Sequence, residues 1–358
     1  MKKIIPGILI LFYSTSWAES DSTKSKVMIS GYVDAYYTYD FSNPSNHERP
    51  SFIYNHKRTN EINLNLGYLK AAYADKGVRA NLAFMAGTYA QYNLASEQGL
   101  LKNIFEANAG VKLSKKKQLW LDAGVFASHI GFESAISKDC WNLTRSILAE
   151  NSPYYESGAK LTYTADNKKW LLSGMILNGW QRIQRAEGNN TPAFGTQVTF
   201  TPNSNITINS STFIGNDKPD SSIQMRYFHN YYGIFQLTSR WGIITGFDIG
   251  AEQKQKRSNQ YNYWYSPVII SRYNLSKKII VAARAEYYHD SKGVIISTNT
   301  PNGFQTFGYS ANIDYTPLSN VSLRVEGKMY DSKDKIFMMG SLPVNQNYCI
   351  TSSIAVSF

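Results

Sequence analysis

Side chains of two kinds alternate along the last eleven residues of the chain, Tyr348 to Phe358. One set, broken only by Ser352, is aliphatic or aromatic, and the other set is small or polar. Alternation with a period of two is typical of a β-strand with one apolar face, and about eleven residues is the length of a tilted strand that crosses a bilayer. The segment, which ends on an aromatic residue, therefore predicts a strand with lipid on one face and water on the other.

The same alternation recurs along the chain from Val27 onward. The predicted strands cover residues 27–39, 60–73, 78–84, 105–111, 119–125, 155–163, 170–178, 193–200, 205–214, 223–237, 243–252, 264–275, 279–289, 304–315, 321–330 and 348–358. The connections that follow even-numbered strands are short, and most of those that follow odd-numbered strands are long. We therefore predict an all-β fold, a transmembrane up-and-down antiparallel β-barrel of about 16 strands (about 14–18), with short periplasmic turns, long extracellular loops and both termini periplasmic.

Aromatic residues support this arrangement, because those with outward parity fall at the ends of strands. The predicted periplasmic ends carry Tyr163, Phe200, Tyr273, Tyr315 and Phe358, and the extracellular ends carry Tyr37, Tyr155 and Tyr287. Aromatic rings in two such belts lie at the depth of the lipid headgroups. Closure of the sheet also leaves no unpaired edge strand in lipid.

The N-terminal residues have the pattern of a secretory signal peptide. A basic start at Lys2 and Lys3 precedes an apolar run of about ten residues and a small-x-small ending at Ala18. No later segment offers the roughly 20 continuous apolar residues of a membrane helix. We therefore predict a signal peptide over 1–18, a periplasmic tether over 19–26 and a single barrel domain over 27–358.

Five segments carry a further likeness. They read GYVDAYY (31–37), RTNEINLNL (58–66), LWLDAGVFASHIGFES (119–134), WNLTRSILAENSPYYESGAKL (141–161) and NGWQ (178–181). They resemble the OmpL-like family of β-barrel porins of Gram-negative bacteria, densely from residue 31 to about 181 and thereafter only in strand rhythm. The resemblance implies an outer-membrane porin, a water-filled channel for passive diffusion of small hydrophilic solutes, and it transfers no catalytic residues.

The terminal strand also resembles the segment that outer-membrane barrels present to their assembly machinery. Phe358, Val356 and Ile354 would form this insertion signal. The expected partners are therefore outer-membrane lipid and lipopolysaccharide, the barrel assembly machinery and small hydrophilic solutes. The sequence leaves open whether the barrel is a homotrimer or a monomer.

Charged side chains concentrate on the inward parity of the predicted strands. The candidates to line the pore are Asp34, Glu61, Arg79, Glu106, Asp122, Arg284, Glu286, Arg324 and Glu326. A barrel of sixteen strands is too wide for side chains to fill its lumen. A basic side chain that faces lipid at mid-bilayer depth costs ~2–4 kcal/mol, which explains the scarcity of charge on the outward parity. For each inward charge, the alternative role is simple pairing across the wall.

The longest connection, about 127–153, is the third extracellular loop in this count. It carries Glu133, Lys138, Asp139, Arg145 and Glu150, which mix both signs of charge. The resemblance implies that this loop folds inward and constricts the channel, as third loops of sixteen-stranded porins do. The alternative is a loop that lies over the mouth. We expect replacement of Arg145 or Arg284 by a neutral residue to shift ion selectivity towards cations.

The two cysteines of the chain allow one structural hypothesis. Cys140 lies in the third loop, and Cys349 has inward parity near the extracellular end of the last strand. Because disulfides persist in exported proteins, a bond between them would pin the loop to the wall. Two free thiols are the alternative.

The formal net charge of +11 does not indicate nucleic acid as a partner. The short turns hold nine Lys and Arg residues against two Asp residues, so most of the positive charge would face anionic headgroups at the periplasmic rim. No phosphate-binding loop, metal-ligand spacing or catalytic arrangement is evident, so we predict no cofactor, no metal and no enzymatic activity. An outer-membrane adhesin with a plugged lumen is the main alternative, and an outer-membrane hydrolase is a weaker one.

Overall fold

The computed structural model describes residues 26–358, so the predicted signal peptide and most of the predicted tether lie outside the described part. Sixteen strands form one closed antiparallel barrel. They are β1 (Val27–Asp40), β2 (Ile62–Asp75), β3 (Val78–Ala86), β4 (Ile104–Lys112), β5 (Gln118–Ala127), β6 (Tyr155–Thr164), β7 (Trp170–Leu177), β8 (Ala193–Asn203), β9 (Ile206–Gly215), β10 (Arg226–Gln236), β11 (Trp241–Gln253), β12 (Tyr261–Asn274), β13 (Ile279–Asp290), β14 (Phe304–Tyr315), β15 (Val321–Ser332) and β18 (Gln346–Ser357). Two short strands, β16 (Phe337–Met339) and β17 (Leu342–Val344), pair separately as a hairpin.

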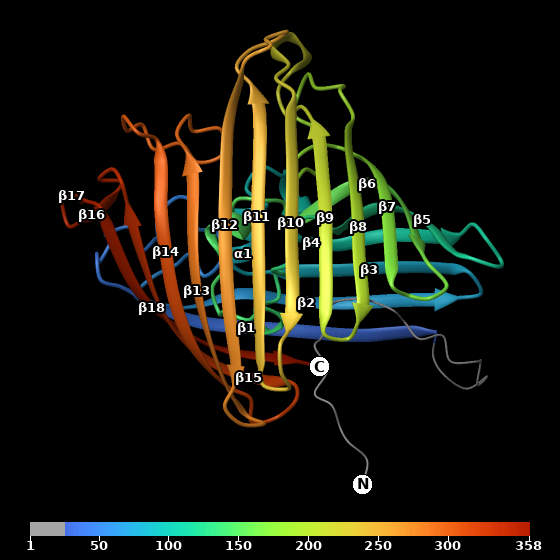
Figure 1. Cartoon of the computed structure of the whole chain (residues 1–358), viewed down its shortest axis with the longest axis horizontal. Coiled ribbons are helices and arrows are strands. Elements are labelled where there is room, and N and C mark those ends of the chain that lie inside the picture. Colours follow the sequence, from blue (N-terminus) through green and yellow to red (C-terminus); the bar gives the residue numbers. More distant parts are fainter. Residues whose placement is uncertain (1–25) are drawn as a thin grey trace.

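The predicted barrel of about sixteen strands is confirmed. Consecutive barrel strands pair with one another, and β18 pairs with β1, so the sheet closes. In Figure 1, strands β8 to β14 stand upright, whereas β1 to β5 run nearly horizontally. Strands on different parts of the wall cross in this way because the strands of a closed barrel tilt relative to its axis.

The two ends of the barrel differ in their connections. Seven connections of two to five residues lie at one end, which we call the turn end, together with the start of β1 and the C-terminus. There the backbone N–H of Gly31 donates to the carbonyl O of Phe358 at 2.8 Å. The opposite end, which we call the loop end, carries the longer connections, so the predicted rhythm of short and long connections is confirmed. The loops used below are L1 (41–61), L2 (87–103), L3 (128–154), L4 (178–192), L7 (291–303) and L8 (333–345).

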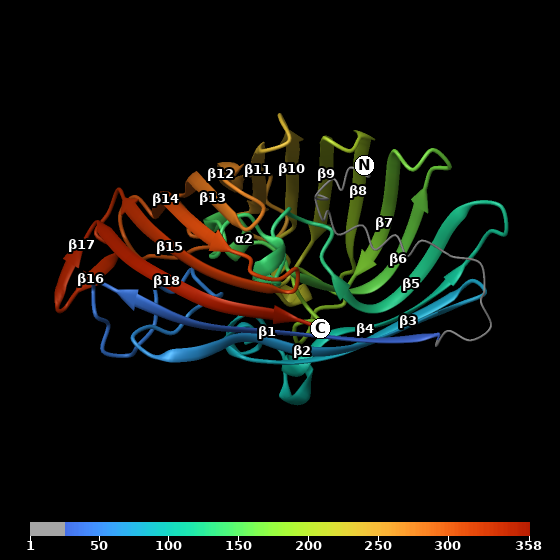
Figure 2. The same ribbon diagram turned by 90° about the horizontal axis from the view of Figure 1, so that it is seen from below.

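The helices are short and belong to the connections. They are α1 (Thr88–Asn93) and η1 (Gly99–Asn103) in L2, η2 (Ser137–Asp139) and α2 (Ile147–Glu150) in L3, and η3 (Asp220–Ser222) between β9 and β10. Within residues 26–358, no helix has both the length and the apolar character needed to cross a membrane. Figure 2 shows α2 inside the ring of strands.

The outward face of the barrel is apolar, as contact with lipid requires. Exposed outward side chains include Val33, Leu82, Leu121, Leu172, Phe247, Ile269, Ile313 and Ile354. His229 interrupts this pattern in β10. Its Nε2 lies 2.8 Å from Oγ of Ser210 on β9, so the two polar groups satisfy each other on the outer face.

The alternation fails where a strand contains a β-bulge. The pairing of β1 with β2 shifts by one residue between Asp34 and Ala35. A slip of one residue moves every later side chain to the other face of the sheet. Leu66 and Tyr68, whose parity predicted the lipid face, therefore point into the barrel and pack in its interior. Lys70 follows them inward and forms an ion pair with a carboxylate of β4.

A second shift affects the pairing of β3 with β4, between Ala83 and Phe84. It turns Phe105 inward, although its parity also predicted the lipid face. The Phe105 ring stacks on Tyr68 with 4.8 Å between the ring centroids. Two bulges in one wall thus place aromatic rings in the lumen.

Candidate functional site

The strand residues predicted to line the pore point into the barrel, with one exception. The inward residues are Asp34, Arg79, Glu106, Asp122, Arg284, Glu286, Arg324 and Glu326, and all are buried or half-buried. Glu61 precedes β2, which begins at Ile62, and belongs to L1 at the loop end. Its carboxylate accepts a hydrogen bond from Arg58 Nε at 2.7 Å. Glu61 therefore lies at the rim of the wall, and its place in the pore lining stays a prediction.

L3 leaves β5, crosses the inside of the barrel and returns to β6. The hydroxyl of Ser137 lies 2.8 Å from the Tyr32 hydroxyl of β1. Asn142 Nδ2 donates to Asn312 Oδ1 of β14 at 2.7 Å. L3 is thus fixed to strands far around the ring from those that it connects (Figure 2).

A buried cluster of charges joins L3 to β13 and β15. The guanidinium of Arg284 lies 3.1 Å from Glu326, 3.5 Å from Glu286 and 3.4 Å from Glu133 of L3. Lys328 completes the cluster at 3.1 Å from Glu286. These side chains are at most 2 % exposed, so water does not screen the attraction between them.

Arg324 is a second wall residue that holds L3. Its guanidinium donates to Asp314 at 2.8 Å, which orients it within the wall. It also donates to the carbonyl O of Ser137 at 2.7 Å and of Trp141 at 3.0 Å. The wall arginines therefore satisfy carbonyl groups of a loop that lies mostly outside regular secondary structure.

The charged residues of L3 mostly hold the loop itself. Arg145 is fully buried and donates to the carbonyl O of Ser134 at 2.6 Å and of Leu143 at 2.8 Å. Lys138 and Asp139 are half-buried and lie 3.6 Å apart. Burial raises the pKa of the Asp139 carboxyl above its ordinary value, and Lys138 opposes this rise.

Neither Arg145 nor Arg284 is exposed to the lumen. A side chain that no ion can reach contributes little to selectivity directly, whereas removal of a buried charge disturbs its partners. The structure therefore corrects our expectation for these two residues, which act as structural anchors of L3.

L1 also enters the barrel and meets L3. His56 Nε2 lies 3.2 Å from the Asp34 carboxylate, and the Ser137 hydroxyl donates to the same carboxylate at 2.8 Å. Further along, the backbone N–H of Tyr54 donates to Glu150 of L3 at 2.9 Å. The two loops are therefore fixed to each other and to β1.

The sequence did not lead us to predict that part of L1 enters the lumen. Phe52 and Ile53 are buried against the inner wall and against residues of L3. The available signal was the run Ser51 to Tyr54, a short apolar stretch within an otherwise polar connection.

The proposed disulfide is not formed in the structure, where both thiols are free and buried. The backbone N–H of Ser134 donates to Cys140 Sγ at 3.2 Å, and Arg49 donates to Cys349 Sγ at 3.3 Å. Burial raises the pKa of the Cys140 thiol to about 11. L3 is held to the wall by the polar contacts described above instead.

The wall from β2 to β6 carries charges that pair with one another. Arg79 Nε donates to Asp122 at 2.6 Å, and the Arg79 side chain is one-third exposed. Lys70 pairs with Glu106. The Lys160 ammonium lies 4.3 Å from the ring centroid of Phe126 on β5.

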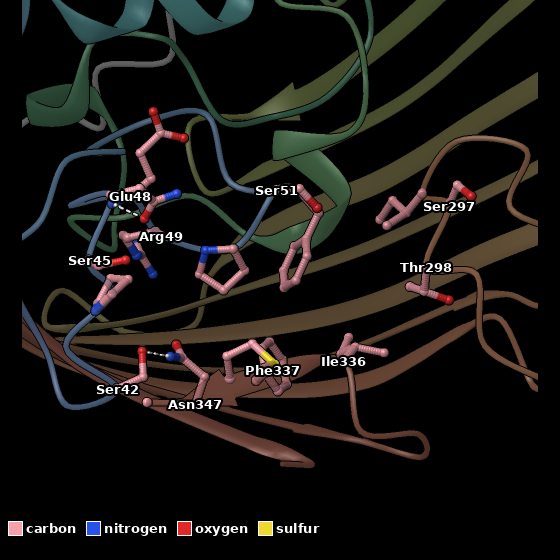
Figure 3. A pocket seen from close by; sticks show the side chains of 17 residues that line it. Ser42, Ser45, Glu48, Arg49, Ser51, Ser297, Thr298, Ile336, Phe337 and Asn347 are labelled. Atoms are coloured by element: carbon pink, nitrogen blue, oxygen red, sulfur yellow. Dashed lines mark hydrogen bonds between the residues drawn. The ribbon is translucent and has the colours of Figure 1, made fainter. Parts of the chain in front are cut away.

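Cavities lie beside the packed loops in the described part of the chain. The mouth cavity, about 520 Å³, lies at the loop end between L1, L7 and L8 (Figure 3). The inner cavity, about 320 Å³, lies under L3, and its wall residues include Glu106, Gln197, Tyr232, Ile244 and Ile270. Among residues 26–358, the structure brings together no group of three His, Cys, Asp or Glu side chains that could hold a metal ion.

A closed barrel with an apolar outer face, a charged inner face and a loop folded into its lumen defines the class of outer-membrane channel proteins. Three solved structures illustrate the shared fold. The anion-selective porin from Comamonas acidovorans is 9% identical, with a TM-score of 0.62 over 94% of this chain and 100% of that chain. OmpT of Vibrio cholerae is 10% identical, with a TM-score of 0.60 over 94% and 99%. The outer membrane channel DcaP of Acinetobacter baumannii is 11% identical, with a TM-score of 0.57 over 94% and 99%.

Within this class, the chain belongs to the family described as "Putative beta-barrel porin-2, OmpL-like", whose profile matches residues 26–358. The resemblance noted from residue 31 to about 181 therefore extends to the C-terminus. A search of the curated proteins finds no match.

Proposed function

We propose that the protein is an outer-membrane porin that passes small hydrophilic solutes by diffusion, with L3 and the inward charges controlling the passage. The observation that carries this proposal is the closed barrel of sixteen strands with charges on its inner face. The side chains of a barrel this wide do not fill its lumen. L3 occupies only part of the remaining space. The paired charges of β2 to β6, of which Glu106 also lines the inner cavity, are the proposed lining of the passage.

We further propose that the turn end faces the periplasm and the loop end faces the outside. Short turns and long loops have this orientation in outer-membrane barrels. Lipid and lipopolysaccharide would surround the outer face, and the assembly machinery would recognise Phe358, Val356 and Ile354. A homotrimer is the proposed assembly, supported by a similar barrel described as a trimer form of OmpT.

Planar-bilayer recording with the purified protein tests the porin proposal. We expect ohmic current steps, and we expect liposomes that contain the protein to swell in solutions of small sugars. Heat-denatured protein from the same sample is the control. Silent but folded and inserted protein would contradict the proposal.

The filled loop end favours a second candidate, a surface-binding barrel with a closed lumen. Phe52 and Ile53 of L1 pack inside the barrel, where an open channel would hold water. This candidate predicts neither current nor swelling from protein that shows the altered gel mobility of a folded barrel.

A further inference from the structure

Apolar side chains line much of the inner wall at the loop end, beside a few buried charges such as Arg226 and Glu252. These apolar side chains are Leu177, Phe213, Phe228, Trp264, Tyr288, Phe304 and Tyr330, and each is at most 5% exposed. They come from β7, β9, β10, β12, β13, β14 and β15 in turn, so they form a belt around much of the ring. A channel for sugars and ions alone does not require such a belt.

The belt is filled by side chains from L1 and L3. Phe52 lies with its ring centroid 4.7 Å from that of Phe304 and 5.3 Å from that of Tyr330. Ile53 of L1 and Ile147 of L3 are buried in the same cluster. Apolar groups of L1, L3 and the wall therefore pack against one another across the loop end of the lumen.

The two cavities lie on either side of this contact. Phe52 and Phe337 line the mouth cavity and also belong to the apolar cluster. Figure 3 shows Phe337 and Ile336 across the mouth cavity from Arg49 and Ser51 of L1. Polar groups of L1 and L7 thus share the mouth cavity with the apolar side chains of Ile336 and Phe337.

The inner cavity continues the apolar surface towards the turn end. Ile130 of L3 belongs to the cluster and also lines the inner cavity. Beyond it, Phe132 and Trp141 of L3 face Ile244, which lies near the turn end of β11. The mouth cavity, the belt and the inner cavity therefore follow one another along the barrel.

We propose that this series is the path of small solutes that carry an apolar ring or branched chain beside their polar groups, and that the Phe52–Ile53 segment of L1 is displaced as they pass. The proposal rests on the porin function proposed above. The apolar group of such a solute takes the place of Phe52 against the belt, and its removal from water is favourable. A sugar or an ion must give up hydrogen bonds to water to cross the same contact.

Uptake of radiolabelled phenylalanine and glutamine by proteoliposomes tests this path. The two amino acids have the same backbone charges and similar size, and differ in the apolar ring. We expect phenylalanine to enter at least tenfold faster than glutamine through the unmodified protein. Equal rates, with current steps present, would overturn the inference and leave the porin function standing. Absence of both uptake and current would overturn both.

The doubly substituted protein Phe52→Ser with Ile53→Ser tests the role of L1. We expect the preference for phenylalanine to fall to about twofold or less and the conductance in potassium chloride to rise severalfold, because water enters the belt. Ser96→Ala, at an exposed position of L2 that lines neither cavity, is the control and should change neither quantity. A double variant that is folded and keeps both the preference and the conductance of the unmodified protein would refute the role assigned to L1.

Discussion

Arg284 joins the wall and L3 through three carboxylates within 3.5 Å. Replacement by Met leaves these buried carboxylates without their central cation. We expect Arg284→Met to lower the free energy of unfolding by about 3–5 kcal/mol, measured by urea unfolding in lipid vesicles. Lys254→Gln, at an exposed loop position, should change it by less than about 0.5 kcal/mol. Equal stability of the two variants would show that the cluster does not anchor L3.

His129, the second residue of L3, makes this anchoring sensitive to acid. Burial lowers the pKa of its imidazole from 6.5 to about 4, and its Nε2 lies 2.8 Å from the carbonyl O of Thr212. Because the folded pKa is the lower one, the unfolded chain takes up the proton first as the pH falls from 6.5 to 4. This uptake removes stability that is fully present above pH 6.5.

From pH 7.5 to 4.5, we expect His129 to account for a loss of about 2–3 kcal/mol. His129→Gln cannot take up this proton. The fall in stability between the two pH values should therefore be smaller in the variant by that amount, measured by urea unfolding of both proteins. Parallel curves for the two proteins would contradict the assignment.

At the scale of elements, three inward glycines of β8 and β11 leave room for L3. A Cβ at Gly195, Gly242 or Gly246 would lie within 2.7 Å of an aromatic side chain of L3. The shortest of these distances is at Gly246, where the Cβ would lie 2.6 Å from the Phe132 ring. The wall is therefore shaped at these positions to accept the loop.

Gly246→Ala should displace the Phe132 ring or strain the wall. We expect a loss of about 1–3 kcal/mol in the free energy of unfolding, together with faster proteolysis of L3. Gly327→Ala on β15 is the matched control, because its Cβ would meet no heavy atom within 4 Å. A Gly246 variant as stable as this control would mean that Phe132 moves without cost.

Much of the barrel follows from the alternation of side chains, because each strand has lipid on one face. The alternation fails at Leu66, Tyr68 and Phe105, because a β-bulge depends on how two strands pair and leaves no mark in the pattern of one strand. The course of L1 and L3 could not be predicted either. Residues such as Arg145 appear in the sequence as charges for a pore, and only their partners in the fold reveal a structural role.

At the scale of the whole molecule, the barrel closes where its two ends meet. Phe358 exchanges two backbone hydrogen bonds with Gly31, at 2.8 and 3.0 Å, and its ring lies against the same glycine. The final residue therefore belongs to the seam between β1 and β18. Its exposed ring remains available to lipid or to a partner during assembly.

Deletion of Phe358 should reduce the amount of folded barrel in the outer membrane severalfold, because the seam loses both hydrogen bonds and the proposed insertion signal loses its last residue. The measurement is the fraction of protein with the gel mobility of a folded barrel in isolated membranes. Leu318→Ala changes another exposed apolar residue at the turn end and should have little effect. Normal assembly of the deletion variant would exclude this role.

The hydrogen bond from Thr144 to Glu326 joins residues 182 positions apart in the chain, and the bond from Asn142 to Asn312 spans 170. L1 and L3 are therefore synthesised well before their partners on β13 to β15. Contacts over such separations form slowly, since the chain between them must first be ordered. We expect the interior to pack in one late step of folding, so the interval before that step is when the unfinished chain is most open to proteases and to aggregation.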